Sequence, residues 1–114
     1  MKIVINKSYG VFGLSHEAIL MYKELANLKM KIEETSDKTY PYNYFIYNDG
    51  ETTRFEPDDI KRNDVHLVKT VETLKEKSFG TYAKLKIIDI PDDCINWTVH
   101  FEDGNEFVYE RAWF

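Results

Sequence analysis

The sequence predicts an α+β fold, a mainly antiparallel sheet with two helices packed on one face. Two amphipathic segments, each preceded by a good N-cap residue, predict the helices, and two alternating segments around Asp-Gly turns predict hairpins. The chain has 114 residues, of which 43% are hydrophobic and 31% charged, as in globular proteins. We therefore expect a single domain over residues 1–114.

The first elements follow from short-range patterns. Residues 2–6 predict a strand, because β-forming residues follow one another in an apolar run typical of a buried strand. Ser15 is a favourable N-cap, and apolar residues recur at helical spacing after it until about Leu28. Met30 and Ile32 then predict a short second strand.

The middle of the chain predicts a loop, a hairpin and the second helix. Residues 33–43 are polar and contain a proline, which indicates a loop. Residues 44–47 and 52–55 predict a hairpin around an Asn-Asp-Gly turn. Asp64 is expected to cap a helix over about 65–78, and residues 83–90 predict a strand that ends at a proline.

The last segment predicts a second hairpin, whose register depends on its loop. A three-residue Asp-Gly-Asn loop places Trp97 opposite Arg111 and Val99 opposite Tyr109. A two-residue loop places Arg111 opposite Asn96 instead. In either register the neighbour of Arg111 is polar or aromatic.

Composition restricts the classes of function. The net charge of −5 argues against binding long nucleic acids through their phosphates, which requires a basic face. The aromatic fraction of 15% indicates an interface or a stacking site, with an aromatic core as the alternative. A single cysteine, Cys94, leaves no internal disulfide and fits a reducing cytoplasm. The N-terminus does not resemble a signal peptide, and no window is apolar enough for a membrane span.

The stretch SYGVFGLS, residues 8–15, raises the question of a phosphate site. A strand, a loop with Gly10 and Gly13 and a helix N-terminus can together bring backbone amides close to an anion. The stretch matches neither the P-loop nor the dinucleotide-binding pattern, so a tight turn is the favoured interpretation. Tyr9 and Phe12 are then candidates for a subunit interface or the edge of a pocket.

The three arginines are the candidate anion ligands. Arg111 falls in the aromatic stripe of the last hairpin, where it would bind a phosphate or extend from the rim of the core. Arg62 precedes the cap of the second helix, and its alternative is a salt bridge with one of the nearby aspartates, residues 58, 59 and 64. For Arg54 we favour a solvated strand face.

Catalysis has little support in the sequence. The three histidines show none of the spacings of metal-binding motifs, and Cys94 has no histidine nearby in sequence. We therefore expect a protein that is not an enzyme and that uses no cofactor or metal.

Four stretches carry a resemblance to a known family: MKIVINKSYGVFGLSHEA, IKRNDVHLVKTVETL, YAKLKIIDIPDD and the final ERAWF. Together they resemble the first described type of the Thoeris anti-defence sponges, a family of phage proteins. The resemblance covers most of the chain apart from residues 33–43. It implies an α+β protomer that forms homo-oligomers, dimers or hexamers built from dimers, in the cytoplasm of the bacterial host.

The resemblance also implies a function. Such sponges bind cyclic ADP-ribose isomers made by bacterial TIR proteins and hold them intact, and some also bind cyclic oligonucleotides at separate sites. Aromatic stacking on adenine and arginine contacts to the diphosphate are implied. The residues chosen for these roles are Arg111 and Arg62 on phosphate, Tyr82 on adenine, Asn96 on ribose and Trp113 as a further stacking residue, with Phe79 and Trp97 as other aromatic candidates.

Two other functions stay open. The aromatic-rich face would also suit a small phage protein that inhibits a host protein by direct binding. An enzyme that cleaves a nucleotide is the third alternative.

Overall fold

The computed structural model describes residues 1–94, 96–102 and 105–110. These residues form strands and helices in the order β1 (Lys2–Asn6), α1 (His16–Leu25), β2 (Met30–Glu34), β3 (Tyr42–Asn48), β4 (Glu51–Arg54), α2 (Val65–Leu74), β5 (Leu85–Asp89), β6 (Trp97–Glu102) and β7 (Asn105–Glu110). Short 3₁₀ turns lie at Pro57–Asp59 and Lys75–Ser78.

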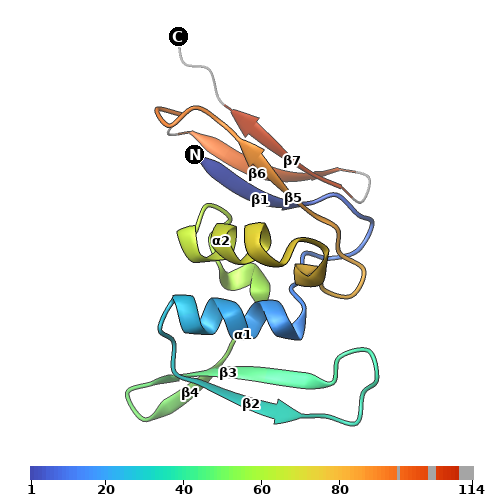
Figure 1. Cartoon of the computed structure of the whole chain (residues 1–114), viewed down its shortest axis with the longest axis vertical. Coiled ribbons are helices and arrows are strands. Elements are labelled where there is room, and N and C mark those ends of the chain that lie inside the picture. Colours follow the sequence, from blue (N-terminus) through green and yellow to red (C-terminus); the bar gives the residue numbers. More distant parts are fainter. Residues whose placement is uncertain (95, 103–104, 111–114) are drawn as a thin grey trace.

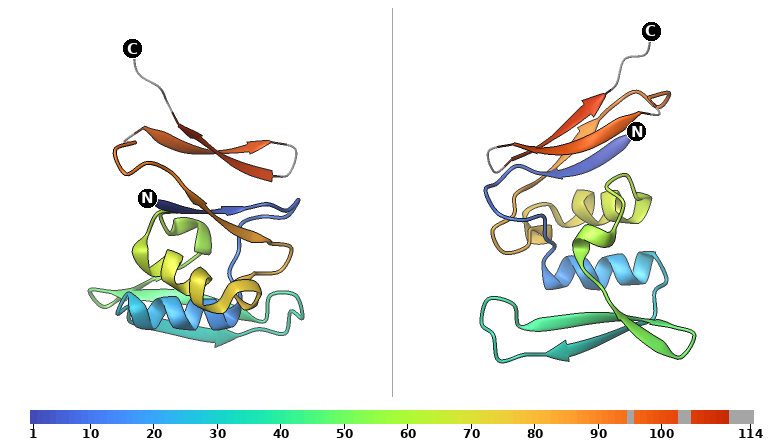
Figure 2. Two further views of the ribbon diagram at one scale, coloured as in Figure 1. Left: turned by 45° about the horizontal axis from the view of Figure 1, so that its top comes forward. Right: turned by 180° about the vertical axis from the view of Figure 1, so that it is seen from behind.

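The strands form three antiparallel sheets, β1–β5, β2–β3–β4 and β6–β7. The two helices lie between β1–β5 and the three-stranded sheet, and the hairpin β6–β7 lies against the other side of β1–β5 (Figures 1 and 2). The α+β class and the antiparallel pairing are therefore confirmed. The helices, however, lie between sheets and do not cover one face of a single sheet.

The edge of β1 that does not pair with β5 is occupied by the chain segment that leads into α2. The Val4 N–H donates 2.9 Å to the Arg62 carbonyl oxygen, so the chain leading into α2 uses this edge of β1. Because a backbone donor in a buried strand needs a partner, the loop takes the place of a further strand.

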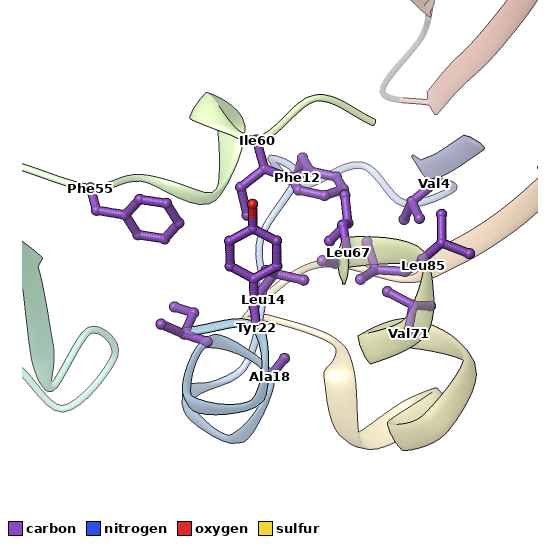
Figure 3. Close-up of a cluster of buried hydrophobic side chains, with 13 residues drawn as sticks. Val4, Phe12, Leu14, Ala18, Tyr22, Phe55, Ile60, Leu67, Val71 and Leu85 are labelled. Atoms are coloured by element: carbon purple, nitrogen blue, oxygen red, sulfur yellow. The ribbon is translucent and has the colours of Figure 1, made fainter. Parts of the chain in front are cut away.

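Strand β1 is buried on both faces, as its apolar run predicts. Val4 faces the helices and belongs to the main core, whereas Ile3 and Ile5 face the hairpin β6–β7 and pack with Ile90. Successive side chains of a strand point to opposite faces, so three consecutive apolar residues serve two cores. The main core gathers side chains from β1, both helices and the segment after β4, where Phe55 and Ile60 reach in (Figure 3).

Both helix caps are confirmed. The Ser15 hydroxyl accepts a hydrogen bond from the Ala18 N–H, and the Asp64 carboxylate accepts from the amides of His66 and Leu67, at 2.8 Å and 3.2 Å. Helix α1 ends at Leu25, three residues before the expected end, because Asn27 has a left-handed φ of 54°.

The first hairpin is confirmed, including its turn. Asn48 pairs with Glu51, and the two residues between them, Asp49 and Gly50, both have positive φ, as a tight hairpin turn requires. Strand β2 pairs with β3 and extends to Glu34, so the expected loop at 33–43 is confined to residues 35–41.

The last hairpin has the two-residue register, which was the alternative, and the three-residue register is wrong. Glu102 pairs with Asn105 and Val99 with Val108, and Trp97 lies opposite Glu110. The register places Glu106 on the buried face, where it is 8% exposed. A one-residue slip would turn that carboxylate outward and away from its partners in the core.

Candidate functional site

The described residues form a cleft of about 460 Å³. It lies between the loop before α1, the β2–β3 loop, the segment after β4 and residues 79–81. Six aromatic side chains contribute to its lining: Phe12, Tyr40, Tyr42, Tyr44, Phe55 and Phe79. Its volume is within the range of small-molecule sites, which are mainly apolar with a few polar groups.

His16, at the start of α1, is fixed by two tyrosines of the cleft. Its ring stacks on Tyr42 with centroids 3.9 Å apart and planes inclined by 11°. Its Nδ1 atom lies 2.7 Å from the Tyr44 hydroxyl oxygen, at hydrogen-bond distance. Helix α1 and strand β3 are thereby joined across the cleft by an ordered aromatic cluster.

Charged side chains lie beside these rings. Arg54, at the end of β4, donates from Nε to Glu56 at 2.7 Å and from Nη2 to the Asn43 side-chain oxygen at 3.1 Å. All three residues line the cleft, and so does Lys38. The cleft therefore combines flat π surfaces with two cations and one carboxylate.

The buried Tyr22 and the half-buried Tyr44 give the fold a measurable alkaline response. Burial raises the pKa of Tyr44 to about 12, assisted by the charge of Tyr42, and burial together with the Asp64 carboxylate raises the pKa of Tyr22 to about 12. An unfolded tyrosine titrates near 10, so the folded state favours the neutral phenol. The resulting stabilisation is complete below about pH 10 and is lost as the pH rises toward 12.

We therefore expect urea unfolding to require less denaturant at each step from pH 10 to pH 12. Tyr22→Phe should reduce this dependence, because the raised pKa of the Tyr22 phenol no longer contributes to it, whereas Tyr47→Phe at an exposed position serves as the control. A Tyr22→Phe protein with the full pH dependence would contradict the assignment.

The glycine loop before α1 is shaped by close backbone contact. A Cβ built on Gly10 would lie 2.1 Å from the Tyr82 carbonyl oxygen, and one built on Gly80 would lie 2.6 Å from the Gly13 carbonyl carbon. The fully buried Asn6 donates to the Gly10 carbonyl oxygen and accepts from the Lys84 N–H, both at 2.9 Å. These contacts agree with the favoured interpretation, a compact turn.

Arg62 is engaged inside the protein. Both of its terminal nitrogens donate to Glu106, with Nη2 2.9 Å from Oε2, and Nη2 also lies 3.3 Å from Asp58. The guanidinium carbon lies 3.7 Å from the centroid of the Phe12 ring. The salt bridge to a nearby aspartate is thus present, and a ligand phosphate would have to displace Glu106.

The other chosen residues do not meet at one place. Asn96 is half-buried and lies just before β6, five residues from Phe101. Phe101 pairs with Glu106, which binds Arg62. Five residues of strand span about 17 Å, so Asn96 and Arg62 lie near opposite ends of the hairpin. Trp97 packs on the second core.

Tyr82 is 67% exposed, with a left-handed φ of 65°. It follows Thr81, which lines the cleft, but is not itself a lining residue. The expected ligands Arg111 and Trp113 lie outside the described residues.

Some residues of the cleft were expected and others were missed. Phe79 was a stacking candidate and Phe12 a pocket-edge candidate, and both line it. His16, Arg54 and the tyrosines of 40–44 were not chosen. One available signal was the spacing of the tyrosines in YPYNY, residues 40–44, because a period of two places side chains on the same side of a strand.

Comparisons with protein-family models, with curated proteins and with solved structures find no match. In the described part of the chain, no helix is long and apolar enough to cross a membrane. Nor do three histidine, cysteine, aspartate or glutamate side chains gather there as a metal site would require. The described residues thus form an α+β protein with an aromatic-lined cleft.

Proposed function

We propose that this protein binds a cyclic ADP-ribose-type signal made by bacterial TIR proteins and sequesters it without cleavage. In this role it is a phage or prophage anti-defence protein that acts in the cytoplasm of the bacterial host as a homo-oligomer. The observation that carries the proposal is the gathering of six aromatic side chains and two cations around one cleft. The resemblance of the sequence to the Thoeris anti-defence sponges supports the same conclusion.

The chemistry of the ligand suits the cleft. A cyclic ADP-ribose presents a purine and a diphosphate, and therefore needs a flat π surface next to positive charge. Tyr42 supplies such a surface, stacked on His16, and Arg54 and Lys38 supply the charge. We place the ligand here rather than at Arg62, whose terminal nitrogens already bind Glu106. Whether cyclic oligonucleotides bind as well is a separate part of the proposal, without a site assigned.

Sequestration without cleavage is the part of the proposal that comes from the resemblance, and two ionisable groups of the cleft bear on it. The Nδ1 of His16 is at hydrogen-bond distance from Tyr44, and its ring is covered by Tyr42. The carboxylate of Glu56 accepts from Arg54. Only one nitrogen of His16 and one oxygen of Glu56 are engaged in these contacts, so the assay of the released nucleotide decides between binding and cleavage.

The test is to incubate the protein with a cyclic ADP-ribose isomer, measure the free nucleotide, and then denature the protein by heat and assay what is released. Depletion followed by recovery of the intact nucleotide is the expected result. Recovery of a hydrolysed nucleotide would indicate an enzyme. No depletion would contradict the proposal and favour the protein-binding alternative.

Tyr42→Ala is expected to weaken binding by about 1–3 kcal/mol, the typical contribution of one base stacked on one aromatic side chain. Tyr47→Ala is the matched control, because Tyr47 lies on the same strand but is exposed and does not line the cleft. Titration calorimetry gives both affinities, and urea unfolding shows whether each variant is folded. Equal binding by the two variants would place the ligand elsewhere.

The protein-binding alternative has one specific observation in its favour. Tyr9, Val11 and Tyr82 are 83%, 66% and 67% exposed, and the contact of Gly10 with the Tyr82 backbone brings their segments together. Exposed aromatic side chains are enriched at protein interfaces.

A further inference from the structure

We infer that Arg54 is the phosphate ligand of the cleft and that Glu56 occupies its place in the absence of ligand. The inference rests on the proposed function, because it assigns the diphosphate of the nucleotide to a particular side chain. It predicts that anion binding proceeds by exchange, with the incoming phosphate oxygen replacing the Glu56 carboxylate on the guanidinium.

The geometry places the exchange inside the cleft. Arg54 Nε lies 2.7 Å from Glu56 Oε1 and Nη2 lies 3.1 Å from the Asn43 oxygen, and all three residues line the cleft. Among the described residues, Arg54 Nη1 has no hydrogen-bond partner. A guanidinium presents its donors as a planar fork that suits phosphate oxygens as well as carboxylates.

The exposure of the two arginine pairs shows which of them can exchange. The Arg54 and Glu56 side chains are 59% and 54% exposed, whereas Arg62 and Glu106 are 15% and 10% exposed. An exposed pair contributes little, because water solvates both charges when it opens. Separating a buried pair leaves an uncompensated charge in the core. Arg54 can therefore release its carboxylate at little cost, and Arg62 cannot.

The backbone at Glu56 keeps its carboxylate near the cleft throughout. The Glu56 N–H donates to Asp59 Oδ2 at 3.0 Å, and the Glu56 carbonyl oxygen accepts from the Asp59 N–H at 2.9 Å. The released carboxylate thus remains beside the bound anion and repels it. Glu56 consequently selects for ligands with enough negative charge to displace it and disfavours neutral nucleosides.

The test is titration calorimetry with inorganic pyrophosphate at low ionic strength. Glu56→Gln should bind it about two- to fivefold more tightly than the unmodified protein, because an exposed competitor is removed. Arg54→Gln should bind at least about tenfold more weakly, because charge-assisted hydrogen bonds are lost. Glu51→Gln is the matched control, since it makes the same change of charge at an exposed position on β4, outside the cleft.

Each result decides the inference. The inference is supported if Glu56→Gln binds pyrophosphate most tightly and Arg54→Gln most weakly. The unmodified protein and Glu51→Gln should then bind alike, with an affinity between the two. The inference is overturned if Glu56→Gln behaves like Glu51→Gln, if Arg54→Gln binds as well as the unmodified protein, or if Glu56→Gln binds no pyrophosphate. Failure of the sponge proposal would look different, as an unchanged level of free cyclic ADP-ribose beside the expected order for pyrophosphate.

Discussion

Replacing Arg62 by methionine is expected to lower the free energy of unfolding by about 3–5 kcal/mol, because the change leaves the Glu106 carboxylate buried without its partner. Glu106 is 8% exposed. Besides its bonds from Arg62, its carboxylate accepts a hydrogen bond of 2.7 Å from the Asn6 N–H. Arg62 also donates to the Val4 carbonyl oxygen. The pair therefore connects β7, β1 and the segment before α2, and urea unfolding should show its loss directly.

A change at Glu106, the other residue of the pair, provides the control for this prediction. The double variant Arg62→Met with Glu106→Gln should recover part of the loss, since a neutral glutamine oxygen still accepts from Asn6. Asp58→Asn should cost no more than about 1 kcal/mol, because that side chain is exposed. If Arg62→Met kept full stability, the Arg62–Glu106 pair would contribute nothing to the fold, and the expected phosphate role of Arg62 would regain support.

Gly10→Ala is expected to destabilise the protein by about 3 kcal/mol or more, because its methyl group would overlap the backbone at Tyr82 and neither segment can yield without a shift. Gly13→Ala is the matched control from the same loop. The nearest atom to a Cβ there is 3.8 Å away, which is an ordinary contact.

Thermal unfolding of the two variants compares them directly. Equal stability of the two would show that the loop at Gly10 adjusts freely. It would also remove the reason for a glycine at that position. A larger loss for Gly13→Ala would contradict the packing described for the two segments.

The features that the sequence predicts correctly are those with local causes. Ser15 and Asp64 cap helices through amides two or three residues away, and the turn at Asp49–Gly50 needs only residues that accept positive φ. The buried character of β1 likewise follows from three consecutive apolar residues. Each of these signals lies within a few positions of the structure that it specifies.

The features that could not be predicted depend on partners far apart in the sequence. The sequence allowed two registers for β6–β7, and the one observed is consistent with the pairing of Glu106 with Arg62, 44 residues earlier, a contact that no hairpin rule contains. One edge of β1 is likewise occupied by a hydrogen bond between the Val4 N–H and the carbonyl oxygen of Arg62, a residue far along the chain. The cleft draws on four separate segments, so Arg54 and His16 each looked unremarkable in their own neighbourhoods.

The pairing of β1 with β5 has a consequence for how the chain is made. Lys2 pairs with Asp89 and Asn6 with Leu85, so β1 leaves the ribosome well before its partner strand β5 has been made. Helix α1 and the sheet β2–β3–β4 have neighbours close in sequence and are able to form earlier. During synthesis the apolar side chains of β1 would stay exposed to water and to other chains. We therefore expect the incomplete chain to aggregate through β1 more readily than through any element from α1 to β4.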